Sequence, residues 1–434
     1  MQLKALISGF MAVFAAALPA RGQFTPAAKP AEPTVTMLGW ADYVAPQVIE
    51  DFTRETGIKV IYDVFESETA LESRLLEAKG VYDIATPPAR LLPKLIAAGQ
   101  LQKLDRAQLP TAQALWPEIG GKLAAADPGG QYALVHMWFG YGLAYDRRKA
   151  AERLPEAQMA SWDALFRTDA LKKFSNCGVQ LPNDADLVLE VALLAGRYSP
   201  ELRGPSEVRR AGEIAGRLRA SVTEFRSGGA AGALADGEIC LALLSASEAA
   251  QARERGKAGE PPKDIGFAVP KEGAPLAIDV TVMLKDAPHV TDATRFLAFL
   301  QRSDIAARNA AAAQLASGVA AAKALLPEAA KADRFIWPED ETIRRLVAVP
   351  APDPALRKAI EREWLKVKTG SYEPAPAPAK PGGKGRPGGK PGKDGKPGRD
   401  GKDPKITPKA ADAPGQPLPR VKKKAKRPGG KAVE

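Results

Sequence analysis

The sequence is poor in the residues that most often bind metals or carry catalysis. Its 434 residues include two histidines, His136 and His289, and two cysteines, Cys177 and Cys240. The histidine count excludes His-rich metal sites, the His-Glu-x-x-His zinc motif and catalysis by several histidines, although it leaves room for a single catalytic histidine. The sequence also lacks a Gly-x-Ser-x-Gly nucleophile motif, a Walker-type phosphate loop and a Cys-x-x-Cys pair. We therefore expect no catalytic residue, no metal and no cofactor.

A surplus of positive charge is confined to the C-terminal segment. The chain carries 62 basic and 51 acidic residues, and residues 371–434 hold 17 of the basic and 6 of the acidic ones. Residues 1–370 are therefore neutral overall, and their net charge gives no support to a nucleic-acid-binding groove. Residues 370–434 are rich in Pro, Gly and Lys and too poor in apolar residues for a core, so we expect a disordered tail. Two interpretations of this tail stay open: attraction to envelope polyanions, or solubilisation without a partner.

The N-terminus has the pattern of an export signal. Lys4 precedes an apolar run, and small residues at positions 20 and 22 fit cleavage by signal peptidase. We expect a signal peptide at 1–22, a Pro/Ala-rich leader at 23–33 and a periplasmic protein. The alternative is a membrane anchor, but the apolar run is shorter than the roughly 20 residues that span a bilayer.

Export changes the interpretation of the two cysteines. Proteins in an oxidising compartment form disulfides, and an even cysteine count is typical of them. We predict a Cys177–Cys240 bond, with two buried free thiols as the alternative.

The length of the chain and its 45% apolar residues indicate two domains. Segments of strand-like apolar sequence alternate with segments of helical spacing, which predicts an α/β fold. The first elements are a strand, a helix, a strand, a helix and a strand at 34–40, 45–57, 58–65, 68–80 and 81–88. This order favours a parallel sheet with right-handed crossovers, and Gly57 stands where a helix C-cap belongs. Further strands are expected at 234–245, 264–273 and 277–284, and a further helix at 290–301.

Longer strings of the sequence resemble one known family. They include GWADYVAPQVIEDFTRETGIKVIYDVFES, YDIATPPA, GLAYD, LADGEICLAL and FAVPKEGAPLAIDV. In this order, from about residue 34 to 369, the chain resembles the periplasmic putrescine- and spermidine-binding proteins of ABC importers. The resemblance implies the type II periplasmic-binding-protein fold, in which two α/β lobes enclose a ligand cleft. It places lobe one at 34–139 and 271–316, and lobe two at 140–270 and 317–369.

The resemblance also implies a ligand site. Trp40 and Tyr43 match an aromatic pair that flanks the amine in this family, where apolar contact combines with cation–π attraction. Asp279 matches a carboxylate that takes an ammonium group, and a charge buried in an apolar strand is costly without such a partner. Glu248 stands where the family commonly has aspartate; a solvated helix residue is the other interpretation of Glu248.

Other positions depart from the family pattern. The replacements are Ser245 for a tryptophan, Ala277 for an aromatic residue, Leu315 for a tyrosine, Leu187 for an acid and Pro88 for a serine. Loss of aromatic rings and of one anionic partner predicts a wider pocket that binds plain putrescine poorly.

Together these features predict a monomeric, exported solute-binding protein of an ABC importer. Its partners would be a membrane permease and a small cationic, polyamine-like ligand. The alternative is an envelope-associated adaptor that acts through the cationic tail and keeps the binding-protein body as a scaffold.

Overall fold

The computed structural model describes residues 32–77, 79–109 and 115–372. The predicted signal peptide, nearly all of the predicted leader and the tail from residue 373 onward lie outside these residues. The last described residue, Tyr372, belongs to the folded part, because its hydroxyl donates a hydrogen bond to Glu363.

The predicted β-α-β-α-β order is confirmed. Its elements are β1 (Thr34–Trp40), α1 (Pro46–Thr56), β2 (Lys59–Phe65), α2 (Glu68–Glu77) and β3 (Ile84–Ala85). β1 pairs in parallel with both β2 and β3, as expected from the crossover rule. Pro46 opens α1 at a position where its missing N–H costs nothing, and Gly57 ends the helix at φ +73° with its N–H bonded to the Thr53 carbonyl.

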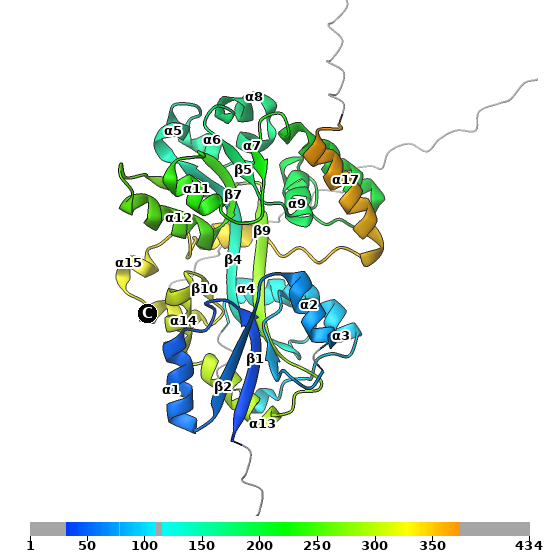
Figure 1. Ribbon diagram of the computed structural model, residues 1–434, viewed down its shortest axis with the longest axis vertical. Helices are drawn as coiled ribbons and strands as arrows, with labels where there is room; N and C mark the ends of the chain where they lie inside the picture. The colour runs from blue at the N-terminus through cyan, green and yellow to red at the C-terminus, as the bar shows by residue number, and fades with distance from the viewer. Residues whose placement is uncertain (1–31, 78, 110–114, 373–434) are drawn as a thin grey trace, which may run out of the picture. The chain divides into compact units, whose positions relative to one another are not determined.

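Two long strands connect the two halves of the molecule. β4 (Ala133–Asp146) pairs antiparallel with β9 (Ala274–Met283) along its first half. Along its second half, from residue 141 to 146, β4 pairs with β7 (Leu241–Ser245) and β8 (Ile265–Ala268). The first lobe therefore contains the strand order β2-β1-β3-β9-β4, and the second contains β4-β7-β5-β6 (Figure 1). The exact lobe boundaries given above stay a prediction.

The remaining strands are short: β5 (Val179–Leu181), β6 (Glu224–Phe225), β10 (Ala316–Ser317) and β11 (Leu346–Val347). The 3-10 turns are η1 (Ala89–Leu91), η2 (Arg106–Gln108), η4 (Lys172–Phe174), η5 (Gly216–Leu218), η6 (Ala320–Leu325) and η7 (Pro354–Leu356). The other helices are α3 (Leu92–Ala97), α4 (Pro117–Leu123), α5 (Arg147–Ala151), α6 (Glu156–Met159), α7 (Asp163–Phe166), α8 (Thr168–Leu171), α9 (Ala185–Ala195), α10 (Pro205–Ala215), α11 (Ala230–Asp236), α12 (Ala246–Ala258), α13 (Val290–Leu300), α14 (Ser303–Ala313), α15 (Glu328–Lys331), α16 (Asp340–Arg345) and α17 (Arg357–Thr369).

The strand expected at 234–245 needs a correction. Its first residues, Leu234 to Asp236, complete helix α11, and the strand β7 begins only at Leu241. Gly237 lies between them at φ +80°, and its N–H bonds the Leu234 carbonyl, as in a helix C-cap.

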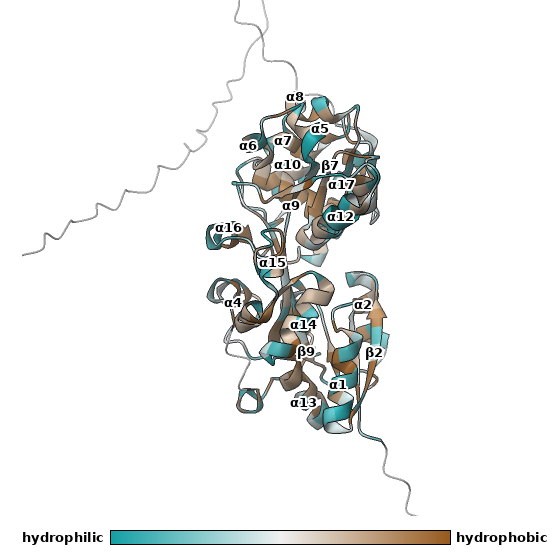
Figure 2. Cartoon of the chain, turned by 90° about the vertical axis from the view of Figure 1, so that its left-hand side faces the viewer, coloured by the Kyte–Doolittle hydropathy of each residue, from teal (hydrophilic) through white to brown (hydrophobic). Residues whose placement is uncertain are grey.

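Helices cover both faces of the sheets. Met37 and Leu38 are consecutive in β1 but enter different hydrophobic clusters, because successive strand residues face opposite sides of a sheet. Met37 packs with Phe52 of α1 and Phe296 of α13. In the second lobe, α9 and α17 lie on one side and α11 and α12 on the other (Figure 1), and α10 packs against α9 and α17. Figure 2 shows the hydrophobic colour of α9 and the more hydrophilic colour of the peripheral helix α16.

The predicted disulfide is confirmed. Cys177 and Cys240 are bonded, and their Cα atoms are 5.6 Å apart. The bond joins the segment that precedes β5 to the residue that precedes β7, two neighbouring strands of the second lobe. Within residues 32–372, apart from the gaps at 78 and 110–114, no helix is both long and apolar enough to cross a membrane.

Candidate functional site

Asp279 and Tyr43 are brought together from distant parts of the chain. Asp279 lies on β9 and is 3% exposed, and the Tyr43 hydroxyl donates a hydrogen bond of 2.6 Å to its Oδ2. The pKa of Asp279 is raised to about 7: burial is the main cause, the Tyr43 hydrogen bond opposes the shift, and the charge of Glu68 adds to it. Burial and the adjacent Asp279 hold the pKa of Tyr43 well above its usual value, so the phenol keeps its proton and acts as the donor.

His136 positions Tyr43. The pairing of β4 with β9 shifts register between Val135 and Met137, so His136 lies at a bulge, a feature that re-aims side chains. Its Nε2 is 3.1 Å from the Tyr43 carbonyl oxygen, which can only accept, so Nε2 carries the proton. Burial lowers the pKa of His136 to about 4, and the ring is therefore neutral near pH 7. The sequence left a catalytic role open for a histidine; the structure gives His136 a positioning contact.

Trp40 ends β1 beside this pair. Its ring lies 4.4 Å from the ring of Phe65 and 6.3 Å from that of Tyr43, measured between centroids. The Tyr62 hydroxyl holds the Trp40 carbonyl at 2.6 Å, which fixes the end of the strand. The indole Nε1 is buried and has no hydrogen-bond partner in the described part of the chain. A buried donor of this kind is costly unless a ligand or water accepts from it.

Glu248 has a clear local role. It is the third residue of α12, and its carboxylate accepts from the Ser245 backbone N–H at 2.9 Å and from the Ser245 hydroxyl at 2.7 Å. The Ser245 oxygen in turn accepts from the Glu248 N–H, which completes a capping box. Ser245, where the resemblance led us to expect a tryptophan, thus caps the helix together with Glu248. A ligand contact by Glu248 stays a prediction.

The replaced positions lie in two settings. Ser245 and Ala277 pair across the sheet with Tyr141 and Phe139 of β4, so two of the three positions expected to lack an aromatic side chain stand opposite one. Leu187 is buried in α9, Pro88 precedes the 3-10 turn η1, and Leu315 is buried after α14.

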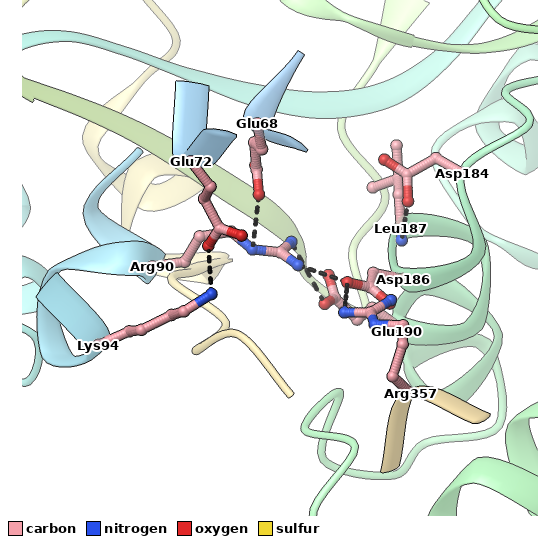
Figure 3. A network of polar contacts seen from close by, with 9 residues as sticks. All are labelled: Glu68, Glu72, Arg90, Lys94, Asp184, Asp186, Leu187, Glu190 and Arg357. Carbon is pink, nitrogen blue, oxygen red and sulfur yellow. Dashed lines mark hydrogen bonds and ion pairs between the residues drawn. The ribbon is translucent and has the colours of Figure 1, made fainter. Parts of the chain in front are cut away.

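A group of charges between the lobes was not expected from the sequence. We call it the interlobe charge cluster; its members are Glu68 of α2, Arg90 of η1, Asp184, Asp186 and Glu190. The first two belong to the first lobe, and the last three belong to α9 of the second lobe and its N-cap (Figure 3). A sequence signal did exist: Asp186 and Glu190 are spaced i, i+4 in the otherwise apolar string ADLVLEVALLA.

Arg90 connects the two lobes. Its Nη2 is 2.6 Å from Asp186 Oδ2, its Nη1 is 3.8 Å from Glu190 Oε1, and its Nε is 3.7 Å from Glu68 Oε2. Asp186 also receives two hydrogen bonds, of 2.8 and 3.1 Å, from Arg357 of α17. The cluster therefore holds more carboxylates than guanidinium groups.

Burial and the surplus of negative charge shift the pKa values of the carboxyl groups in this cluster. Burial holds the pKa of Glu190 well above its usual value. The charge of Arg90 opposes this shift, and the charges of the neighbouring carboxylates add to it. Burial likewise raises the pKa of Asp184. Burial also holds the pKa of Tyr141 well above its usual value, and the charges that add to this shift include those of both Asp184 and Asp279. The charges of the Asp279 site and of the interlobe charge cluster therefore both act on Tyr141 of β4.

No metal centre is apparent in the part of the chain that the structure describes, since it contains no group of three or more His, Cys, Asp or Glu arranged around an ion. What this region offers is a set of buried carboxylates with aromatic rings beside them. Such a set is suited to positively charged nitrogen groups, through charge-assisted hydrogen bonds and cation–π contacts.

Known proteins share the sequence and the fold. Residues 47–335 match the family described as bacterial extracellular solute-binding protein. The chain is 35% identical to the putrescine-binding periplasmic protein SpuD of Pseudomonas aeruginosa, over 76% of this chain and 90% of that protein. It is 32% identical to the putrescine-binding periplasmic protein PotF of Escherichia coli, over 78% of this chain and 92% of that protein.

Among solved structures, the spermidine/putrescine ABC transporter substrate-binding protein PotD of Streptococcus pneumoniae has the same fold. Its TM-score is 0.68 at 24% identity, and the match covers 78% of this chain and 99% of that chain. The fold is thus the two-lobed α/β fold of periplasmic binding proteins. With a family match over most of the folded part, the chain belongs to the bacterial extracellular solute-binding proteins.

Proposed function

We propose that this protein binds a small cationic amine between its two lobes and presents it to the membrane permease of an ABC importer. The observation that carries the proposal is the Asp279 site: a buried carboxylate, bonded by Tyr43, that takes part in no ion pair within the described residues. A buried carboxylate of this kind costs the unliganded protein free energy, which an ammonium group would recover. The names of the relatives, which include putrescine- and spermidine-binding periplasmic proteins, support the ligand class and the periplasmic location.

The ligand would lie against Trp40 and Tyr43, with its ammonium group on Asp279. Carboxylates from both lobes would favour the closed arrangement once a cation is bound, and the permease would recognise that arrangement. In this account residues 34–139 and 271–316 move against residues 140–270 and 317–369. Export would use the signal peptide at 1–22, and the protein would act as a monomer without catalysis.

Calorimetry with linear amines tests the proposal. We expect micromolar to millimolar binding of at least one amine by the wild type, and a loss of roughly 10- to 150-fold in affinity for Asp279→Asn, which keeps the shape but removes the charge. Asp146→Asn is the matched control, because Asp146 is also buried but caps α5, which asparagine caps equally well. If the wild type binds no amine at millimolar concentration, the adaptor hypothesis replaces the transport hypothesis.

A further inference from the structure

We propose that Arg90 determines ligand specificity: its guanidinium group occupies the place of a diamine's second ammonium, so the preferred ligand carries a single ammonium group. This inference rests on the proposed function and concerns which amine the Asp279 site takes.

The chain holds Arg90 next to that site. Pro88 forms a β-bridge with Asp279, and the Val280 N–H bonds the Pro87 carbonyl at 3.0 Å. Arg90 follows two residues later in η1, so its backbone is tied to the strand that carries Asp279. Its guanidinium group extends from there toward α9 of the opposite lobe (Figure 3).

The contacts of Arg90 are those that a cationic ligand would make in this place. The guanidinium group reaches Asp186 and Glu190 of the second lobe and Glu68 of the first, and the side chain is 21% exposed. Glu190 is 3% exposed, and its Oε1 has no hydrogen-bond partner in the described residues, so only the charge of Arg90 at 3.8 Å compensates it. Without Arg90, this buried carboxyl group would have no cation beside it and could pair with a ligand's ammonium group instead.

Arg90 is part of the chain, which favours its ion pairs over those of a ligand that must bind from solution. A diamine that placed its second ammonium on Asp186 or Glu190 would have to displace a group whose effective concentration is set by the chain itself. A ligand with one ammonium group leaves the Arg90 ion pairs intact. The second ammonium therefore adds little affinity in the wild type, and its desolvation counts against the diamine.

The test compares two amines of equal chain length, n-butylamine and 1,4-diaminobutane, by calorimetry at one pH and one salt concentration. In the wild type we expect the monoamine to bind as tightly as the diamine or up to about threefold more tightly. In Arg90→Gln, the freed carboxylates accept the second ammonium, and the ratio should move by about tenfold or more in favour of the diamine. Melting temperatures check that each variant is folded.

Two further variants keep the test decisive. Arg357→Gln removes a guanidinium group that binds the same Asp186 but comes from its own lobe, so the ratio of the two amines should stay at the wild-type value. Arg90→Lys keeps a cation should Arg90→Gln fail to fold. A single ammonium cannot span Asp186 and Glu190 as the guanidinium group does, so the ratio should move in the same direction by a smaller factor.

An unchanged ratio in the Arg90 variants, or an equal change in Arg357→Gln, would refute the role of Arg90. Failure of the proposed function looks different: neither amine would bind the wild type or any Arg90 variant.

Discussion

Replacing Asp279 by asparagine should stabilise the unliganded protein at alkaline pH while weakening its binding of amines. Asp279 is buried, and its pKa rises from the ordinary value of 3.8 to about 7. A carboxyl group with a raised pKa binds more protons in the folded than in the unfolded state between these two values. The free energy of unfolding therefore falls as pH rises through this window, and it stays at the lower level above pH 7.

The magnitude follows from the size of the shift. A difference of about three pKa units corresponds to about 4 kcal/mol at 1.36 kcal/mol per unit, which is an upper limit for the stability that ionised Asp279 costs above pH 7. Asparagine carries no such cost and still accepts the Tyr43 hydrogen bond through its amide oxygen. We expect Asp279→Asn to match the wild type near pH 4 and to exceed it by about 2 to 4 kcal/mol at pH 8.

Urea unfolding of both proteins at pH 4, 6 and 8 without ligand measures this difference. The titration of His136 and other groups is common to both proteins and cancels in the comparison. A difference that is the same at pH 4 and pH 8, or a variant that is less stable at pH 8, would refute the assignment of a raised pKa to a buried Asp279.

Other predictions address the disulfide, the aromatic pair and the tail. Reducing the Cys177–Cys240 bond, which closes a loop of 63 residues, should lower the free energy of unfolding by about 4 kcal/mol; equal unfolding midpoints with and without reductant would contradict this. Trp40→Ala should weaken binding of the preferred amine by about 0.5 to 2 kcal/mol in calorimetry. Unaltered affinity would show that the indole does not contact the ligand. A chain ending at Tyr372 should keep its melting temperature and ligand response but elute from a heparin column at lower salt than the full chain. Equal retention of the two would show that the tail's charge has no such effect.

Local sequence rules predicted much of the first lobe. The strand at 34–40 agrees with β1 residue for residue, and Gly57 is the C-cap that its position indicated. These elements depend on apolar periodicity and on the conformational freedom of glycine, which are properties of short segments. The strand expected from residue 234 was partly wrong, because the apolar residues of ALAD fit a helical turn as well as a strand.

The site was only partly predictable. The resemblance indicated Tyr43 and Asp279 as site residues. In the structure a hydrogen bond joins them, although they lie 236 residues apart in the sequence. The sequence did not predict the interlobe charge cluster, because its members come from separate segments. No local pattern indicates that Arg90 faces Asp186 and Glu190. The resemblance indicates a lost acid at Leu187, whereas the acids that face Arg90 are its neighbours on α9, Asp186 and Glu190.

The most direct test of the account is the number of protons released when an amine binds at pH 7. With a pKa of about 7, about half of the Asp279 carboxyl groups are protonated at this pH, and an ammonium group bound against them favours the ionised form. Calorimetry in buffers of different ionisation enthalpy should therefore report the release of about half a proton per amine bound by the wild type, and almost none by Asp279→Asn. Binding without proton release by the wild type, or equal release by both proteins, would contradict the claim that Asp279 is the group that receives the ligand's charge.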